Sequence, residues 1–271
     1  DTYDAAAVLQ REVGDRLLQR LEYIKQTPSS VLDLGAGTGY ISKDLLQRYP
    51  KSKLVAVDIA QSMLKKTQQH RHWLRKPAVV CASAEALPFM NDAFDMVISN
   101  LMFQWCEDLP RVFTGVNRIL KGNSLFTFTT FGPDTMRELR ESWSQVDDYE
   151  HTSTFQDMHD VGDALMKSGF QQPVVDTEMI TLTYKSLSDL MKDLKHIGAT
   201  NASTNRNRGL TGRQKFKALE KAYQVFRTEE GLYPLTYEVV YGHGWAQAAV
   251  EVMGGARIIP IAEIKETLNK S

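Results

Sequence analysis

Residues 31–39 read VLDLGAGTG, and this stretch decides the fold. A short apolar run ends in a glycine-rich turn, and a helical pattern opens directly after it at Tyr40. Glycines allow a tight turn and let a ligand approach closer than a Cβ atom permits. A glycine turn between a strand and a helix is the context that nucleotide-type ligands need. The sequence therefore predicts a ligand site at the end of the strand.

The next strand pattern, over 54–57, closes on Asp58, about twenty residues after the turn, where an acidic residue accepts hydrogen bonds from a ribose diol. Two features argue against a dinucleotide. The turn reads G-x-G-x-G, with Tyr40 where the dinucleotide fingerprint has its third glycine. Asp33 suits a ligand that ends in an ammonium group and would be awkward beside a pyrophosphate. A turn without any ligand is disfavoured by the presence of Asp58.

Strand and helix patterns alternate outward from the turn. Strand patterns at 31–34, 54–57, 79–82, 94–99 and 125–131 are separated by helical patterns at 40–49, 61–72 and 109–120, after a first helix over 5–24. This alternation predicts an α/β fold with a mostly parallel sheet covered by helices on both faces. Ligands of such sheets lie beyond the carboxyl ends of the strands, where the distinctive residues of this chain fall.

The second half of the sequence does not continue this alternation of strand and helix patterns. Two amphipathic helical patterns, with apolar faces that include Leu187 and Leu190 in one and Phe216 and Leu219 in the other, lie between extended stretches at 174–184 and 235–244. We expect one domain over 1–271, in which 186–230 is a helical insertion that forms a lid or a docking face.

Composition limits the classes of function. With 32 basic and 33 acidic residues, the net charge is −1, so nothing in the overall charge indicates a nucleic acid partner. Cys81 and Cys106 are the only cysteines, which predicts no disulfide framework and favours the cytoplasm. No apolar run reaches the roughly 20 residues of a membrane span. We expect no membrane partner and no metal site. The chain begins without Met, so a short leader is expected to precede it.

The glycine turn with Asp58 resembles motif I of the class I S-adenosylmethionine (SAM)-dependent methyltransferases. The resemblance continues through residues 83–89 (SAEALPF) and 94–100 (FDMVISN) and so covers the first half of the chain. It implies a Rossmann-like sheet, SAM as cofactor and S-adenosylhomocysteine as product. The cofactor-binding residues that it implies are Asp33, Gly35, Ala36, Gly37, Gly39, Asp58, Ile59, Met63, Ser83, Ala84, Glu85 and Asn100. Met63 covers adenine, with a core methionine as the alternative, while Tyr3 and Gln10 close over the cofactor or belong to a frayed terminus.

The sequence marks the site of the methyl acceptor less clearly than the site of the cofactor, because methyl transfer to an anionic nucleophile needs positioning and desolvation more than a base. No residue is therefore singled out as catalytic. Residues 100–106 (NLMFQWC) follow a strand at the place where an acceptor approaches. Gln104 and Trp105 are predicted to bind the substrate, whereas Phe103 is expected in the core.

The second half resembles one subgroup of that family, the malonyl-[acyl-carrier-protein] O-methyltransferases, at 196–202 (HIGATNA), 209–213 (GLTGR), 235–238 (LTYE) and 243–245 (HGW). This resemblance implies esterification of the free carboxylate of a malonyl thioester, at the start of pimelate synthesis for biotin. That carboxylate is ionised at neutral pH, in agreement with the absence of an obvious base. The candidate anchors for it are His196, Asn201, Arg206 and Arg208.

A carrier protein is strongly acidic, so a basic docking face is expected. The insertion supplies Lys192, Lys195, Arg206, Arg208, Arg213, Lys215, Lys217 and Lys221, with Arg137 and Arg140 on another helix. A solvated surface is the alternative for each of them. Two other functions stay open: a relative of the respiratory complex I assembly factor that hydroxylates an arginine of a partner subunit, and a methyltransferase of a quinone or another small ring.

Overall fold

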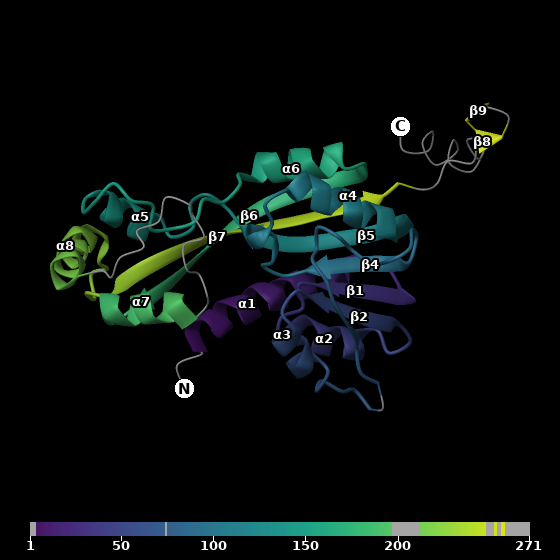
Figure 1. Cartoon of the computed structure of the whole chain (residues 1–271), viewed down its shortest axis with the longest axis horizontal. Coiled ribbons are helices and arrows are strands. Elements are labelled where there is room, and N and C mark those ends of the chain that lie inside the picture. The colour runs from purple at the N-terminus through teal and green to yellow at the C-terminus, as the bar shows by residue number, and fades with distance from the viewer. Residues whose placement is uncertain (1–3, 74, 197–211, 248–251, 254–255, 258–271) are drawn as a thin grey trace.

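The computed structural model describes residues 4–73, 75–196, 212–247, 252–253 and 256–257. Its centre is a seven-stranded sheet in the order β3-β2-β1-β4-β5-β7-β6 (Figure 1). The strands of the first half are β1 (Ser30–Leu34), β2 (Lys53–Asp58), β3 (Ala78–Cys81), β4 (Phe94–Ser99) and β5 (Leu120–Phe131). These five strands pair in parallel, which confirms the α/β fold.

Helices connect these strands. The bounds are α1 (Asp4–Arg20), α2 (Tyr40–Arg48), α3 (Gln61–Thr67) and α4 (Leu109–Ile119), with one-turn 3₁₀ helices η1 (Leu21–Tyr23) and η2 (Phe103–Trp105). Asp108 caps α4 by accepting a hydrogen bond from the amide of Arg111 at 3.0 Å, and Pro110 lies in its first turn. The helix predicted over 61–72 is wrong at its end, because α3 stops at Thr67 and a turn follows in which His72 bridges Arg75.

The second half adds two long strands, β6 (Phe170–Tyr184) and β7 (Tyr233–Ala246). β7 lies between β5 and β6 and runs antiparallel to both, so the parallel arrangement ends there. Burial patterns reveal which residues face the core but not the direction of a strand, so the sequence did not predict this reversal. β6 is an edge strand, and its register shifts between Gln171 and Val174, where Pro173 is tolerated because an edge bulge needs no amide donor.

The remaining helices are α5 (Arg137–Ser144), α6 (Met158–Lys167), α7 (Leu187–His196) and α8 (Arg213–Tyr223), followed by η3 (Gln224–Phe226). Two-residue strands β8 (Val252–Met253) and β9 (Ala256–Arg257) pair with each other, apart from the main sheet. Among the helices that the structure describes, none has a stretch long and apolar enough to cross a membrane.

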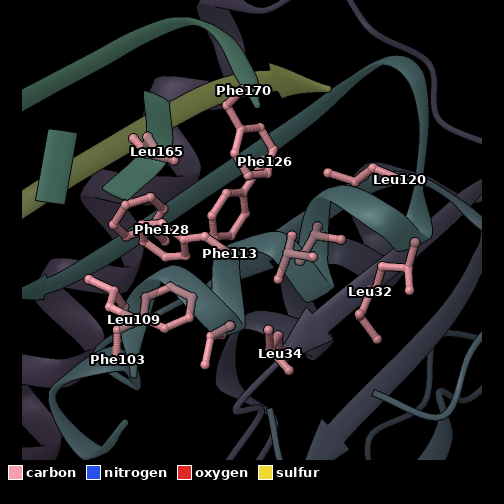
Figure 2. Close-up of a cluster of buried hydrophobic side chains, with 14 of the residues drawn as sticks. Leu32, Leu34, Phe103, Leu109, Phe113, Leu120, Phe126, Phe128, Leu165 and Phe170 are labelled. Carbon is pink, nitrogen blue, oxygen red and sulfur yellow. The ribbon is translucent and has the colours of Figure 1, made fainter. Parts of the chain in front are cut away.

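Alternate residues of each strand face opposite layers of helices. Leu32 and Leu34 of β1 point into a core with α4 and α6, in which Phe103, Phe113 and Phe126 meet edge to face at 5.2–5.8 Å between ring centroids (Figure 2). Val31, on the other face of the same strand, packs against α1 and α2. Asp33 shares the parity of Val31 and therefore faces α1 and α2.

Beyond the end of β5, the long strands β6 and β7 carry a second core with α5, α7 and α8 (Figure 1). Tyr223 and Tyr237 are among its largest fully buried side chains. Leu9 and Val13 of α1 belong to the same core, so α1 joins the two parts. The predicted helices between β6 and β7 are therefore present, and α5, which precedes β6, packs with them.

Helix α1 is held across the sheet at its second half. The guanidinium of Arg16 donates to the carboxylate of Glu178 on β6, and Arg20 donates to Asp176 at 2.9 Å. Arg20 also lies 3.9 Å above the ring centroid of Tyr241 on β7. These anchors direct the first half of α1 towards the carboxyl ends of the strands.

Candidate functional site

A cavity of about 1460 Å³ lies at the carboxyl ends of β1, β2 and β4. This is where parallel sheets bind their ligands, and a cavity of this size holds a nucleoside with an amino acid attached. The cofactor residues expected from the sequence that line it are Gln10, Asp33, Gly35, Ala36, Gly37, Asp58, Ile59, Met63, Ser83, Ala84, Glu85 and Asn100. The structure thus brings together residues from six separate segments of the chain.

The glycine turn is shaped for close approach. Gly35 and Gly37 have φ angles of +75° and +52°, in the left-handed region that other residues rarely adopt. A Cβ atom on Gly35 would lie 2.3 Å from Cγ of Met102, whereas one on Gly37 would meet no atom within 4 Å. Gly37 therefore presents bare backbone to the cavity, and a side chain there would occupy space that a ligand needs.

Helix α3 holds the turn from behind. Thr67 Oγ1 donates to the carbonyl of Gly37 at 2.8 Å, and His70 Nε2 lies 2.8 Å from the carbonyl of Thr38. Gly39 is not among the residues that line the cavity; a Cβ atom there would lie 2.8 Å from Cγ2 of Thr67. Its place in the site is thus to let α3 pack closely against the turn.

Asp58 stands at the end of β2. Its Oδ2 accepts the amide of Gly37 and its Oδ1 accepts the amide of Ala60, both at 2.8 Å. Each carboxylate oxygen has a second lone pair, which leaves acceptors for the two hydroxyls of a ribose. The same side chain thereby fixes the glycine turn and faces the cavity.

Asp33 is the most buried charged side chain of the site, with 1% of its surface exposed. Its Oδ2 accepts the hydroxyl of Ser42 at 2.5 Å. Burial raises the pKa of Asp33 to about 7, and the nearby charge of Asp58 adds to this effect. A buried carboxylate needs a cationic partner to stay ionised. The ammonium group of SAM is such a partner, so the residues present fit this cofactor.

Asn100, at the end of β4, fixes the first half of α1 to the sheet. Its Nδ2 donates to the backbone carbonyl of Gln10 at 3.0 Å, and its Oδ1 accepts the hydroxyl of Thr129 at 2.8 Å. The amide of Leu101, which has a φ of 48°, donates to Oγ1 of Thr129 at 2.9 Å. Asn100 therefore closes the cavity by joining β4, β5 and α1.

Ile59, Met63, Ser83, Ala84 and Glu85 also line the cavity. Ile59 is 75% exposed and Met63 is half-buried, so Met63 is not a fully buried core methionine. The backbone amide of Glu85 donates to the hydroxyl of Ser83 at 3.2 Å, and its side-chain Oε1 accepts the amide of Glu107 at 3.3 Å. The apolar side chains of Ile59 and Met63, with one carboxylate at Glu85, suit a purine ring with an exocyclic amine.

Residues 103–106, shortly after Asn100, differ in whether their side chains line the cavity or lie elsewhere. Trp105 is 53% exposed and lines the cavity, and its role as a substrate wall stays a prediction. Gln104 does not line it, because its Nε2 turns back to the carbonyl of Leu101 at 2.6 Å. Phe103 is in the core, as expected. Burial raises the pKa of Cys106 to about 11, so this thiol at the cavity wall stays neutral and is a poor nucleophile.

Tyr3, Asn201, Arg206 and Arg208 lie outside the described residues, and the side chains of Lys195 and His196 are likewise not described. Other residues line the cavity although the sequence did not point to them: Arg11, Tyr40, Lys43, Lys66, Gln69 and His70. They come from the inner faces of α1 and α2 and from α3 and the turn after it. Helical periodicity alone does not say which ligand such faces meet.

The predicted docking residues fall into two groups. Arg213, Lys217 and Lys221 are exposed along one face of α8, at four-residue spacing. Lys192 is exposed on α7, 3.3 Å from Asp189. By contrast, Lys215 donates to Asp147 at 2.6 Å, and Arg140 donates to the carbonyls of Pro133 and Thr135. Those two cations therefore hold the second core together.

A family model described as a methyltransferase domain matches residues 32–128. Among solved structures, the YcgJ protein of Bacillus subtilis is similar at 16% identity with a TM-score of 0.60, over 87% of this chain and 99% of that one. Geranyl diphosphate C-methyltransferase of Streptomyces coelicolor is similar at 14% identity with a TM-score of 0.51, over 86% of this chain and 78% of that one. These similarities confirm the Rossmann-like methyltransferase fold.

Two curated relatives are much more similar in sequence. The malonyl-[acyl-carrier protein] O-methyltransferase of Halorhodospira halophila is 48% identical over 90% of this chain and 83% of its own length. The protein of the same name from Gallionella capsiferriformans is 45% identical over 95% of this chain and 90% of its own length. With such identity along nearly its whole length, this chain belongs to the malonyl-[acyl-carrier protein] O-methyltransferase family.

Proposed function

We propose that this enzyme transfers the methyl group of SAM to the free carboxylate of a malonyl thioester on acyl carrier protein. The product is the methyl ester that starts pimeloyl synthesis for biotin. The observation that carries the proposal is the cavity itself, which is lined by buried Asp33, half-buried Asp58 and exposed Trp105. Family membership supplies the acceptor. The two free thiols, Cys81 and Cys106, support placement in a reducing compartment such as the cytoplasm.

The arrangement of the cavity suits an acceptor that is already a nucleophile. When bound, SAM would supply a methyl carbon activated by its sulfonium: an ionised carboxylate oxygen would bond to this carbon as the carbon–sulfur bond breaks, with S-adenosylhomocysteine as the leaving group. The malonyl carboxylate is ionised at neutral pH, so the enzyme needs no general base. Asp33 holds the ammonium end of the cofactor and Asp58 holds its ribose, which fixes the direction of the methyl group. Trp105, which is half exposed at the cavity wall, would cover part of a bound acceptor and displace water from it.

We assign the insertion over 186–230 the role of a lid or docking face. Its helix α7 packs through Leu187 and Leu190 onto the same core as Leu9 and Val13 of α1. The first half of α1 lines the cavity, so the insertion adjoins the cofactor site. His196, Asn201, Arg206 and Arg208 stay candidates for anchors of the malonyl carboxylate, with Trp105 as the candidate wall beside the acceptor, whereas Gln104 is turned away from the cavity.

The reaction can be tested with purified malonyl carrier protein, whose mass is measured before and after incubation with enzyme and SAM. We expect a gain of one methylene that stays with the acyl group when the thioester is cleaved. Acetyl carrier protein, which has no free carboxylate, serves as the control and should stay unchanged. A methyl group on protein side chains would contradict the proposal. No transfer at all, with SAM still bound, would favour the role of the complex I assembly relative.

The docking of the carrier gives a second prediction. We propose that the acidic carrier binds the exposed cations Arg213, Lys217 and Lys221 of α8, together with Lys192 and Lys195 of α7. Reversal of two charges, Arg213→Glu with Lys217→Glu, should lower kcat/KM for the carrier substrate roughly tenfold at low ionic strength, because long-range attraction steers association. The affinity for SAM should not change, because these residues do not line the cavity.

A matched control is the double reversal Lys51→Glu with Lys53→Glu, which makes the same change in net charge at two exposed positions at the start of β2. Steady-state kinetics at several salt concentrations would compare the two proteins. An equal loss in both would show that net charge, and not the α8 face, attracts the carrier.

A further inference from the structure

The first half of α1 approaches the cofactor cavity unusually closely, at Gly14. A Cβ atom there would lie 3.1 Å from Cδ1 of Ile41 and 3.3 Å from Nδ2 of Asn100. Gln10 and Arg11 precede Gly14 by four and three residues and so share its helix face. Both line the cavity, which places this face of α1 over the carboxyl ends of β1 and β4.

Arg11 is the one arginine among the described residues that line this cavity. It forms no ion pair with another described residue. Its backbone is held in place because Leu9 and Val13, on the opposite side of the helix, are buried in the second core. Arg11 is therefore an exposed cation on a fixed stretch of helix, and it lines the cavity together with Tyr40, on whose hydroxyl its charge acts.

The carboxylate that this cation faces can be inferred from Asp33. Asp33 points towards α1 and α2, the same side from which Arg11 enters, and its hydrogen bond to Ser42 of α2 confirms this direction. The amino acid end of SAM carries its ammonium and its carboxylate on one carbon atom. Once Asp33 holds the ammonium, the carboxylate lies close by and needs a donor on the same side.

We propose that Arg11 binds the carboxylate of the cofactor's methionine part and that Arg11 and Asp33 together recognise its zwitterion. A guanidinium offers two parallel N–H donors that match the two oxygens of a carboxylate. The lysines of the cavity wall, Lys43 and Lys66, come from α2 and α3 and offer only single-point contacts. The inference rests on SAM as the cofactor and concerns a residue that the sequence motifs do not mark.

Binding measured by calorimetry tests this without any methyl transfer, so its outcome is independent of the identity of the acceptor. Two ligands are compared: S-adenosylhomocysteine, and methylthioadenosine, which has the nucleoside and the thioether but no amino acid. Arg11→Met should weaken S-adenosylhomocysteine about 10- to 100-fold, the loss of a charge-assisted hydrogen-bonded pair, and leave methylthioadenosine unchanged. Arg11→Lys should fall between, because it keeps the charge and loses the paired donors.

Lys25→Met, at an exposed lysine that does not line the cavity, controls for the change in net charge and should bind both ligands as the parent does. Equal weakening of both ligands by Arg11→Met would overturn the proposal, since it would mean that the side chain only shapes the wall. Unchanged affinity for S-adenosylhomocysteine would also overturn it. If KM for the malonyl thioester then rose instead, the carboxylate bound by Arg11 would be that of the acceptor.

Discussion

An Asp33→Asn protein will bind SAM at least about a hundredfold more weakly than the parent, although its unliganded form will unfold at an equal or higher temperature. Removal of one partner from a buried charge pair costs several kcal/mol, and each 1.4 kcal/mol is about a tenfold change in affinity. The free protein, in contrast, no longer buries a carboxylate whose ionisation burial opposes. Asparagine keeps the size of the side chain and can still accept the hydroxyl of Ser42.

The same residue predicts how the affinity for SAM depends on pH. Burial raises the pKa of Asp33 to about 7 in the free protein, so below pH 7 the carboxyl is protonated and must lose a proton before it pairs with an ammonium. The affinity of the parent should therefore fall as the pH decreases from 8 to 6, by about tenfold at one unit below the pKa. The Asp33→Asn protein should lack this dependence of the affinity on Asp33, because asparagine does not titrate. The titration of the ligand itself is common to both proteins and cancels in the comparison.

Calorimetric titration with SAM at three pH values, and thermal unfolding without ligand, would measure these effects. Ser52→Ala provides a control, because it changes a buried polar side chain away from the cavity and should leave the affinity for SAM intact. A variant at Asp33 that keeps the affinity of the parent would contradict the role of this carboxylate as the ammonium partner.

Gly35→Ala will destabilise the fold by about 2–5 kcal/mol and abolish SAM binding. Two costs combine: alanine at a φ of +75° costs roughly 1–2 kcal/mol, and an extra methyl group in a packed region costs roughly 1–3 kcal/mol. The new Cβ atom would lie 2.3 Å from Cγ of Met102 and 2.6 Å from its Cβ, atoms too close to the backbone to move aside. Met102 itself lines the cavity, so any shift also changes the ligand site.

Gly115→Ala is the control for this prediction. Gly115 lies inside α4, and a Cβ atom there would meet no atom within 4 Å. Alanine is a better helix former than glycine, so this variant should gain about 0.5–1 kcal/mol in the free energy of unfolding. Denaturant unfolding of both variants would decide the matter; equal stability of Gly35→Ala and the parent would mean that the turn tolerates a side chain.

Much of the fold could be predicted from the sequence where one local signal dominates. The strand over 94–99 is found with the predicted bounds, because its buried run is closed by Asp92 with a positive φ on one side and Asn100 on the other. The helix after Pro110 is found for a similar reason, since Asp108 and the proline define its start. The predicted end of α3 at residue 72 was wrong, because the observed end at Thr67 depends on the tertiary contact between His70 and Thr38, which no local pattern reveals.

The cofactor site was predictable to the extent that its residues follow strands in order. Asp33, Asp58 and Asn100 all stand at carboxyl ends of strands and all line one cavity. Gln104 shows the limit of this reasoning, because its side chain turns to a nearby carbonyl instead of the cavity. Arg11 is the reverse case, a cavity residue that the sequence did not indicate. The periodicity of α1 identifies its apolar face, but the surroundings of its polar face depend on how α1 crosses the sheet.

The crossing of α1 also determines when the cofactor site can form. Residues 4–20 are synthesised well before β6 and β7, because their anchors Asp176, Glu178 and Tyr241 are more than 150 residues further along the chain. Such distant contacts form late, because a long loop must close before they stabilise anything. A growing chain that has already exposed its glycine turn to the cell therefore lacks the wall with Gln10 and Arg11. Tight cofactor binding should begin only after β7 has left the ribosome and taken its place in the sheet.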